Sequence, residues 1–321
     1  MKLAMLYAGQ GSQHPGMGQD LYDNNSVFRE TFDRVNQAVD FDLKEVCFED
    51  AEQKLNQTEY TQPCMVAFQT ALTAMLSDAG VLDKAEYVAG LSLGEYSALQ
   101  AAGLWSAEDA VKIAAFRGKA MMESAKGLDC GMTAIIGLER EDLSPLLSEN
   151  CYITNDNCPA QLVISGERES VEKTTEKAKE AGAMKTIPLK VSGPFHTPYM
   201  SKAGDKLAEF LPKIPNQAMN KTVVYNFLGE PKEGADVTDL LVKQVQNGVR
   251  MRESLIYLIG QGVDTFLEVG PGKTLSGFVK RTAKAMEKGN LLPAGVKASN
   301  IKTYTVESYE DVEALRGVLY E

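Results

Sequence analysis

The sequence Gly-Leu-Ser-Leu-Gly at positions 90–94 constrains the fold of this 321-residue chain more than any other stretch. It matches Gly-x-Ser-x-Gly, a tight turn between a strand and a helix that exposes the serine oxygen. Positions 86–89 suit a buried strand, and positions 95–102 suit the start of a helix. N–H groups and the dipole at a helix N-terminus favour negative charge beside such a serine. The pattern predicts an α/β fold with Ser92 as candidate nucleophile; a purely structural Gly-flanked turn is the alternative.

Composition excludes several functional classes. The net charge of −11 argues against a general binder of nucleic acid or anionic membranes. Five cysteines are scattered without a C-x-x-C pair, which is typical of free thiols in a reducing cytosol. The apolar start at positions 1–7 is too short for a signal peptide, and no apolar run reaches membrane-spanning length. We therefore expect a soluble cytoplasmic protein.

Hydrophobic periodicity divides the chain into alternating strands and helices. We expect strands at 3–7, 86–89, 223–226 and 265–269, and helices near 28–39, 60–76, 110–125, 199–210, 240–246, 252–259, 274–286 and 308–319. Pro63 is expected in the first turn of its helix, where proline is tolerated. Residues 288–299 are expected to form a loose loop.

The order of the expected strands and helices changes between residues 127 and 192. Expected elements there are strands at 132–137, 152–155, 161–165 and 184–189, helices at 141–148 and 168–182, and a turn at 155–160. This β-α-β-β-α-β order is the ferredoxin-like pattern. The sequence thus predicts a small subdomain, 127–192, inserted into a large α/β domain made of residues 1–126 and 193–321.

Only two histidines, His14 and His196, could serve Ser92 as a general base. His14 lies in a glycine-rich loop and is expected at the surface. His196 lies between Pro194 and Pro198, which stiffen the backbone around it. This favours His196 as the base, although a structural loop histidine fits the same setting. No acidic residue between Ser92 and His196 stands out as a third member.

Arg117 is surrounded by apolar residues on its expected helix. An arginine on a buried face needs an anionic partner. One interpretation is an ion pair with a protein carboxylate. The other is a bidentate clamp on a substrate carboxylate, which the planar guanidinium suits better than lysine does.

Two glycine-containing stretches suggest nucleotide binding but fail the full patterns. Gly-Lys-Thr at 272–274 would need a glycine at position 267, which is leucine. Gly9 and Gly11 lack the third glycine of a dinucleotide fingerprint. Both stretches are interpreted as loops next to strands.

Eight segments taken together resemble the malonyl-CoA:acyl-carrier-protein transacylases of fatty-acid synthesis. They occur in the family's order at 9–13, 61–63, 90–97, 116–118, 155–159, 191–196, 225–226 and 268–272. The resemblance implies a hydrolase-like large domain with a parallel sheet and an inserted ferredoxin-like subdomain.

The resemblance also implies roles for individual residues. Ser92 resembles the nucleophile and His196 its base, oriented by a backbone carbonyl at Gln244. The oxyanion hole is implied at the N–H groups of Gln10 and Leu93. The resemblance also implies that Arg117 binds the malonyl carboxylate and that Gln62 lines the acyl pocket. Phe195 is implied to be a bulky wall that disfavours an α-methyl branch.

The implied reaction is ping-pong transfer of malonyl from malonyl-CoA to the phosphopantetheine thiol of acyl carrier protein. It requires no bound cofactor or metal, and we expect a monomer without nucleic-acid or membrane partners. A basic cluster is the candidate carrier-docking face: Lys273, Lys280, Arg281, Lys284 and Lys288. Alternatives are a hydrolase on the same scaffold, an acyltransferase of polyketide assembly, and an inactive scaffold protein.

Four positions depart from the family pattern. Leu91 stands where histidine is common, and Ala8 replaces a common proline. The loop at 247–251 carries Gly248 and Met251 where proline and tryptophan are frequent. That loop follows Gln244 directly, so the departure bears on how His196 is oriented.

Overall fold

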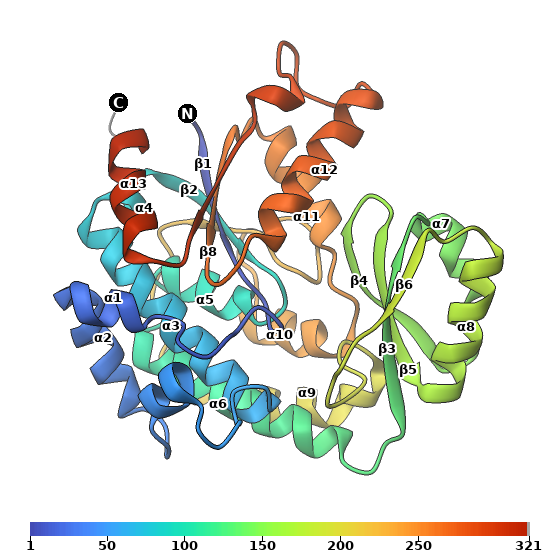
Figure 1. Cartoon of the computed structure of the whole chain (residues 1–321), viewed down its shortest axis with the longest axis horizontal. Helices are drawn as coiled ribbons and strands as arrows, with labels where there is room; N and C mark the ends of the chain where they lie inside the picture. The colour runs from blue at the N-terminus through green and yellow to red at the C-terminus, as the bar shows by residue number, and fades with distance from the viewer. Residues whose placement is uncertain (320–321) are drawn as a thin grey trace.

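The computed structural model describes residues 1–319 and contains two β-sheets, one parallel and one antiparallel (Figure 1). The parallel sheet has the order β7-β2-β1-β8-β9. Its strands are β7 (Thr222–Val223), β2 (Ala85–Gly90), β1 (Leu3–Tyr7), β8 (Thr265–Val269) and β9 (Lys302–Val306). The α/β class and the parallel sheet predicted from the sequence are confirmed.

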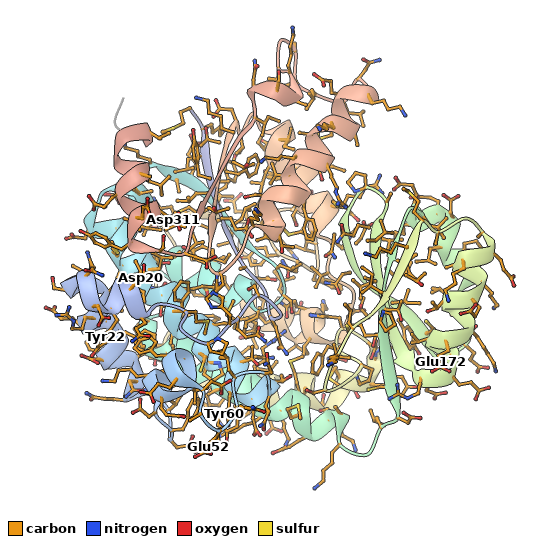
Figure 2. All side chains as sticks on the ribbon, viewed as in Figure 1. Asp20, Tyr22, Glu52, Tyr60, Glu172 and Asp311 are labelled. Carbon is orange, nitrogen blue, oxygen red and sulfur yellow. The ribbon has the colours of Figure 1, made fainter. Side chains whose placement is uncertain are left out.

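Helices cover both faces of the parallel sheet, as parallel strands require. Their bounds are α1 Gln19–Asn24, α2 Ser26–Asn36, α3 Thr58–Asp78, α4 Val81–Lys84, α5 Gly94–Ala101, α6 Ala107–Ala125, α9 Ser201–Phe210, α10 Val237–Gln246, α11 Met251–Gly260, α12 Thr274–Lys288 and α13 Tyr309–Leu319. A π-helical turn spans Glu45–Glu49, and short 3-10 turns span Ser144–Leu146, Pro198–Met200, Leu211–Lys213 and Ala298–Asn300. Side chains fill the space between these layers (Figure 2).

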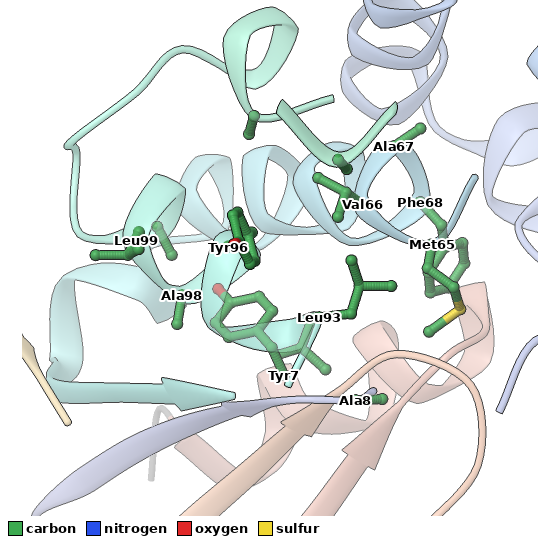
Figure 3. Packing of buried hydrophobic residues seen from close by; sticks show 14 of the residues in the cluster. Tyr7, Ala8, Met65, Val66, Ala67, Phe68, Leu93, Tyr96, Ala98 and Leu99 are labelled. Carbon is green, nitrogen blue, oxygen red and sulfur yellow. The ribbon is translucent and has the colours of Figure 1, made fainter. Parts of the chain in front are cut away.

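Alternate residues of β1 belong to different apolar clusters, because successive side chains of a strand point to opposite faces. Met5 and Tyr7 pack with residues of α3, α5 and α6. Leu6 packs with residues of α11 and α12 on the other face. Figure 3 shows Tyr7 and Leu93 packed together between the strand and the helices. The central strand that leads into the predicted site is therefore fixed from both sides.

The antiparallel sheet has the order β4-β5-β3-β6. Its strands are β3 (Cys130–Ile136), β4 (Cys151–Cys158), β5 (Gln161–Glu167) and β6 (Lys185–Pro188), with α7 (Arg140–Leu143) and α8 (Arg168–Glu180) between them. This is the strand order of a ferredoxin-like unit, which confirms the β-α-β-β-α-β prediction. The unit lies at one side of the parallel-sheet unit in Figure 1.

The two units meet where β4 runs past the loop after α10. The Asp156 N–H donates to Val249 O at 2.9 Å, and the Val249 N–H donates to Thr154 O at 2.9 Å. Arg252 donates to Glu139 of the small unit at 2.5 Å. The loop that follows Gln244 is therefore bonded directly to the small unit.

Several element predictions were wrong in detail. Pro63 lies in the second turn of α3, because that helix begins at Thr58 rather than Tyr60. The predicted turn at 155–160 is largely strand, since β4 continues to Cys158 with irregular pairing. The strand predicted at 223–226 is only two residues long, and β9 was not predicted. Within the described residues, no helix is long and apolar enough to cross a membrane.

Candidate active site

Ser92 lies in the turn between β2 and α5 with a positive φ of 52°. This backbone conformation is strained for any residue that has a Cβ. The turn is tight enough to demand glycine on both sides. A Cβ at Gly90 would lie 2.0 Å from the Gly94 carbonyl carbon, and one at Gly94 would lie 2.1 Å from Tyr7 O. The strained serine is thus held by close backbone packing of the elbow against β1.

Ser92 Oγ lies 2.6 Å from His196 Nε2. On the other side of the ring, Nδ1 lies 2.8 Å from Gln244 O, which can only accept a hydrogen bond. Nδ1 therefore carries the proton, and Nε2 is free to accept the Ser92 hydroxyl proton. A main-chain carbonyl occupies the place that an acidic side chain takes in a Ser-His-Asp triad.

Burial, together with the positive charge of Arg117, lowers the pKa of His196 to about 4, against the effect of hydrogen bonds to backbone carbonyls. The ring is only 5% exposed. At neutral pH it is therefore the uncharged base. His14, the other histidine, is half exposed and its Nε2 lies 3.2 Å from a Glu307 oxygen, whereas the Ser92 hydroxyl contacts His196.

Arg117 projects from α6 and is 1% exposed. Its Nη2 donates to Ser92 Oγ at 3.3 Å and to Gln244 Oε1 at 3.2 Å. Its guanidinium carbon lies 5.0 Å from the centre of the Tyr96 ring. Across residues 1–319 no carboxylate lies within 4 Å of the guanidinium, and Arg117 Nε has no hydrogen-bond partner. An ion pair with a protein carboxylate is thus not what holds this buried cation.

The loop after β1 approaches the elbow closely, because a Cβ on Gly9 would lie 2.7 Å from Leu91 O. In the described part of the chain, the backbone N–H groups of Gln10 and Leu93 donate to no protein acceptor. The Gln10 side chain donates to Thr58 at 2.9 Å and accepts from Gln62 at 3.4 Å. Two unused N–H donors therefore flank the serine turn.

Three further predicted positions surround this centre. Gln62 is fully buried with its Oε1 unpartnered, and its Nε2 lies 3.4 Å from Met121 Sδ. Phe195 is buried next to His196. Leu91, which stands in place of a histidine, packs against the apolar cluster of α11 and α12. The basic cluster lies on α12 and on Lys273 just before it, and Arg281 donates to Gln161 of the small unit at 2.5 Å.

Sequence reasoning gave no role to two buried residues, Glu95 and Asn226. Asn226 Oδ1 accepts from the Ser92 N–H at 2.7 Å, and its Nδ2 donates to Gly90 O at 2.6 Å. Glu95 Oε2 accepts from the Gln244 side chain at 3.0 Å and from the Asn226 N–H at 3.1 Å. Only the position of Glu95 directly after the elbow motif could have drawn attention to it.

Burial raises the pKa of Glu95 to about 7, while the hydrogen bonds from Gln244 and Asn226 and the charge of Arg117 hold it down. Its second oxygen, Oε1, has no partner among the described residues. No group of three metal-ligating side chains occurs in residues 1–319. The site is built from Ser92, His196, Arg117 and backbone donors on one large unit.

A serine on an elbow, hydrogen-bonded to a neutral histidine beside free N–H donors, is the geometry of covalent acyl transfer. A family model described as "Acyl transferase domain" matches residues 5–309. This match places the protein in the class of acyltransferases.

Individual relatives narrow the class. A malonyl CoA-acyl carrier protein transacylase of Bacillus subtilis is 38% identical, over 89% of this chain and 92% of that protein. The crystal structure of a malonyl CoA-acyl carrier protein transacylase from Clostridium perfringens has a TM-score of 0.90 at 38% identity, covering 100% of this chain and 98% of that one. A malonyl-transacylase solved in complex with its type II PKS acyl-carrier protein has a TM-score of 0.90 at 32% identity, covering 99% and 100%. The chain therefore belongs to the malonyl CoA-acyl carrier protein transacylase family.

Proposed function

We propose that the protein transfers a malonyl group from malonyl-CoA to the phosphopantetheine thiol of an acyl carrier protein, through a malonyl ester of Ser92. The observation that carries this is the position of Arg117. A buried guanidinium without a carboxylate partner donates to the same Ser92 oxygen that contacts the histidine base. The names of the relatives support the same substrate and acceptor.

In the first half-reaction, His196 Nε2 takes the Ser92 proton while Ser92 Oγ attacks the thioester carbonyl. The Gln244 carbonyl holds the imidazolium through Nδ1. The N–H groups of Gln10 and Leu93 then stabilise the oxyanion, by about 3–4 kcal/mol per donor in comparable sites. Collapse expels the CoA thiolate, which takes the proton from His196.

In the second half-reaction, the phosphopantetheine thiol gives its proton to His196 and attacks the ester carbonyl. The same N–H donors stabilise the second oxyanion. Ser92 leaves with the proton from His196, so atoms and charges balance over the cycle. The thiol arm arrives with the substrates, and no further group is needed for either step.

Arg117 selects the acyl group in this scheme. A malonyl carboxylate can accept from Arg117 Nε, which has no protein partner, and from Nη2 in place of Ser92 Oγ. Acetyl has no carboxylate and would leave the buried charge unpaired. Gln62 and Phe195 would line the rest of the pocket, with Phe195 disfavouring an α-methyl branch.

We place carrier docking at the α12 cluster of lysines and Arg281, since an acidic carrier protein needs a local basic face on an acidic enzyme. Charge reversal at Lys280 and Arg281 should raise the KM for the carrier and leave malonyl loading unchanged. Equal effects on both half-reactions, or none, would remove this face from the proposal.

We further propose a monomer that acts in the cytoplasm, with residues 127–192 as the small subdomain. One chain supplies every site group named above. All five cysteines are free thiols, as a reducing compartment favours.

A transfer assay tests the proposed function. The enzyme is mixed with malonyl-CoA, with and without a holo acyl carrier protein, and malonyl-carrier and free malonate are both measured. Malonyl-carrier formation supports the transferase. Malonate release without a carrier would favour the hydrolase, and no turnover in either arm would favour the scaffold. Comparing fatty-acid and polyketide carriers distinguishes the two pathways.

A further inference from the structure

Glu95 is a fully buried carboxylate on the first turn of α5, three residues after Ser92. Its hydrogen bonds run to Gln244 and Asn226, each of which bonds to the machinery of the site. A buried carboxylate at such a place either supports the fold alone or holds the reacting groups in position. The two hydrogen bonds that Oε2 accepts distinguish these possibilities.

The first contact fixes the side chain of Gln244. Its Nε2 donates to Ser92 O at 2.8 Å and to Glu95 Oε2 at 3.0 Å, and its Oε1 accepts from Arg117 at 3.2 Å. An amide can in principle sit in either of two orientations. The Glu95 carboxylate selects this one together with Ser92 O and Arg117, because the reverse would place the amide oxygen against two oxygens and the amide nitrogen against the guanidinium. The main-chain carbonyl of the same residue holds His196.

The second contact fixes Asn226. Glu95 Oε2 accepts from its main-chain N–H at 3.1 Å. The Asn226 side chain then bonds the elbow at two points, accepting from the Ser92 N–H and donating to Gly90 O. The strained φ of Ser92 is therefore supported through Asn226.

Glu95 also places a negative charge one amide group away from Arg117. A buried cation without a compensating anion is unfavourable. The chain of contacts from guanidinium to amide to carboxylate supplies that anion while leaving the face of Arg117 Nε unpaired. This arrangement keeps the N–H of Arg117 Nε available to a ligand.

We propose that Glu95 is a positioning residue: its carboxylate fixes Gln244 and Asn226, which in turn hold the nucleophile, the base and the arginine. The effect on malonyl selection rests on the proposed function. The effect on Ser92 reactivity does not, so the two can be tested separately.

The test compares two substitutions at position 95. Glu95→Gln keeps an oxygen that can accept both hydrogen bonds. Glu95→Met keeps a side chain of similar length and has no such acceptor. If Glu95→Met fails to fold, Glu95→Ala is used in its place, because the smaller side chain leaves room for water.

Glu268 provides a matched control. It is a buried carboxylate on β8, 1% exposed, that accepts from the N–H groups of Leu275 and Ser276 at 2.9 and 2.7 Å. Its hydrogen bonds run to the start of α12 and not to the site. Glu268→Gln and Glu268→Met should lower the unfolding temperature without changing the reactivity of Ser92.

The first readout is the rate at which a fluorophosphonate probe labels Ser92 in the folded variants, checked by thermal unfolding. Glu95→Met should label about 10- to 100-fold more slowly than the parent, since small misplacements cost this much. Glu95→Gln should recover to within about threefold of the parent. Labelling of Glu95→Met at the parent rate, or an equal loss in Glu95→Gln, would overturn the proposal.

The second readout is the ratio of malonyl to acetyl loading from the two CoA esters. Glu95→Met should lower this ratio by about tenfold, because Arg117 loses its fixed position, and Glu268→Met should leave it unchanged. A parent that reacts with the probe but takes no malonyl would refute the proposed function. In that case the labelling series alone still decides the role of Glu95.

Discussion

At the scale of single residues, His196 combines two properties that a general base needs. It is held by a fixed acceptor at Nδ1, and burial with the nearby Arg117 charge lowers its pKa to about 4. A lowered pKa means that the active, uncharged ring persists well below neutral pH. His196 can therefore accept the Ser92 proton at neutral pH without first releasing a proton of its own.

This gives a pH prediction. Ser92 labelling should stay nearly constant as pH falls from neutrality and should be half lost only near pH 4, when His196 gains its proton. The measurement is best made with Glu95→Gln, since burial raises the pKa of Glu95 to about 7. Half-loss close to pH 6.5, the ordinary value for histidine, would contradict the buried, neutral ring.

Arg117 carries the second prediction at this scale. Arg117→Ala should lower kcat/KM for malonyl-CoA by about 100-fold, the range for losing a charge-assisted pair, and should not lower acetyl-CoA turnover, because acetyl makes no pair with the guanidinium. Steady-state kinetics with both esters provide the check. Arg34→Ala, which removes a surface pair with Glu108, is the matched control. An equal loss for both esters would mean that Arg117 supports the structure rather than selecting the substrate.

Sequence reasoning found the residues whose chemistry is local or rare. Ser92 follows from the spacing of its glycines, and His196 from there being only two histidines. Gln244 came only from a family resemblance, and Glu95 was missed. Gln244 bonds to Glu95 across 149 residues of sequence and Asn226 bonds to Glu95 across 131, so no local pattern encodes these contacts.

At the scale of elements, the elbow depends on glycines that allow the backbones of β1, β2 and α5 to pack closely. Gly94→Ala should destabilise the protein by about 3 kcal/mol, because its Cβ would lie 2.1 Å from Tyr7 O and cannot be accommodated without moving backbone. Chemical unfolding measures this. Gly277→Ala in α12 is the control: nothing lies within 4 Å, so alanine should stabilise by about 0.5–1 kcal/mol. Similar effects of the two substitutions would contradict the packing argument.

Strands with a clear run of apolar residues could be predicted from the sequence. Strands whose bounds depend on pairing with distant segments could not. β1 and β8 match their expected bounds because they are buried, apolar strands. β9 is an edge strand whose residues are mostly half exposed, so it lacks the apolar run of its neighbours. Its β-branched residues were the available signal. β4 extends three residues past its predicted end, to Cys158, where its Asp156 bonds to Val249.

At the scale of the whole molecule, the small unit is tied to the loop that follows Gln244. Gly248→Ala tests that link, because its Cβ would lie 2.5 Å from Ile153 O on β4. We expect a loss of about 1–3 kcal/mol of stability, as for other overpacked sites, together with slower Ser92 labelling. Gly260→Ala, at the end of α11 with open space around it, serves as the control. Unchanged labelling would separate the small unit from the orientation of His196.

The central claim is that Ser92 carries the malonyl group between its two thiol carriers. Intact-protein mass after brief mixing with malonyl-CoA tests it most directly, with acetyl-CoA and Ser92→Ala as controls. The account predicts a gain of one malonyl group that is absent from both controls and is discharged by a holo acyl carrier protein. A chain that gains no mass, or gains it equally in Ser92→Ala, would contradict the account.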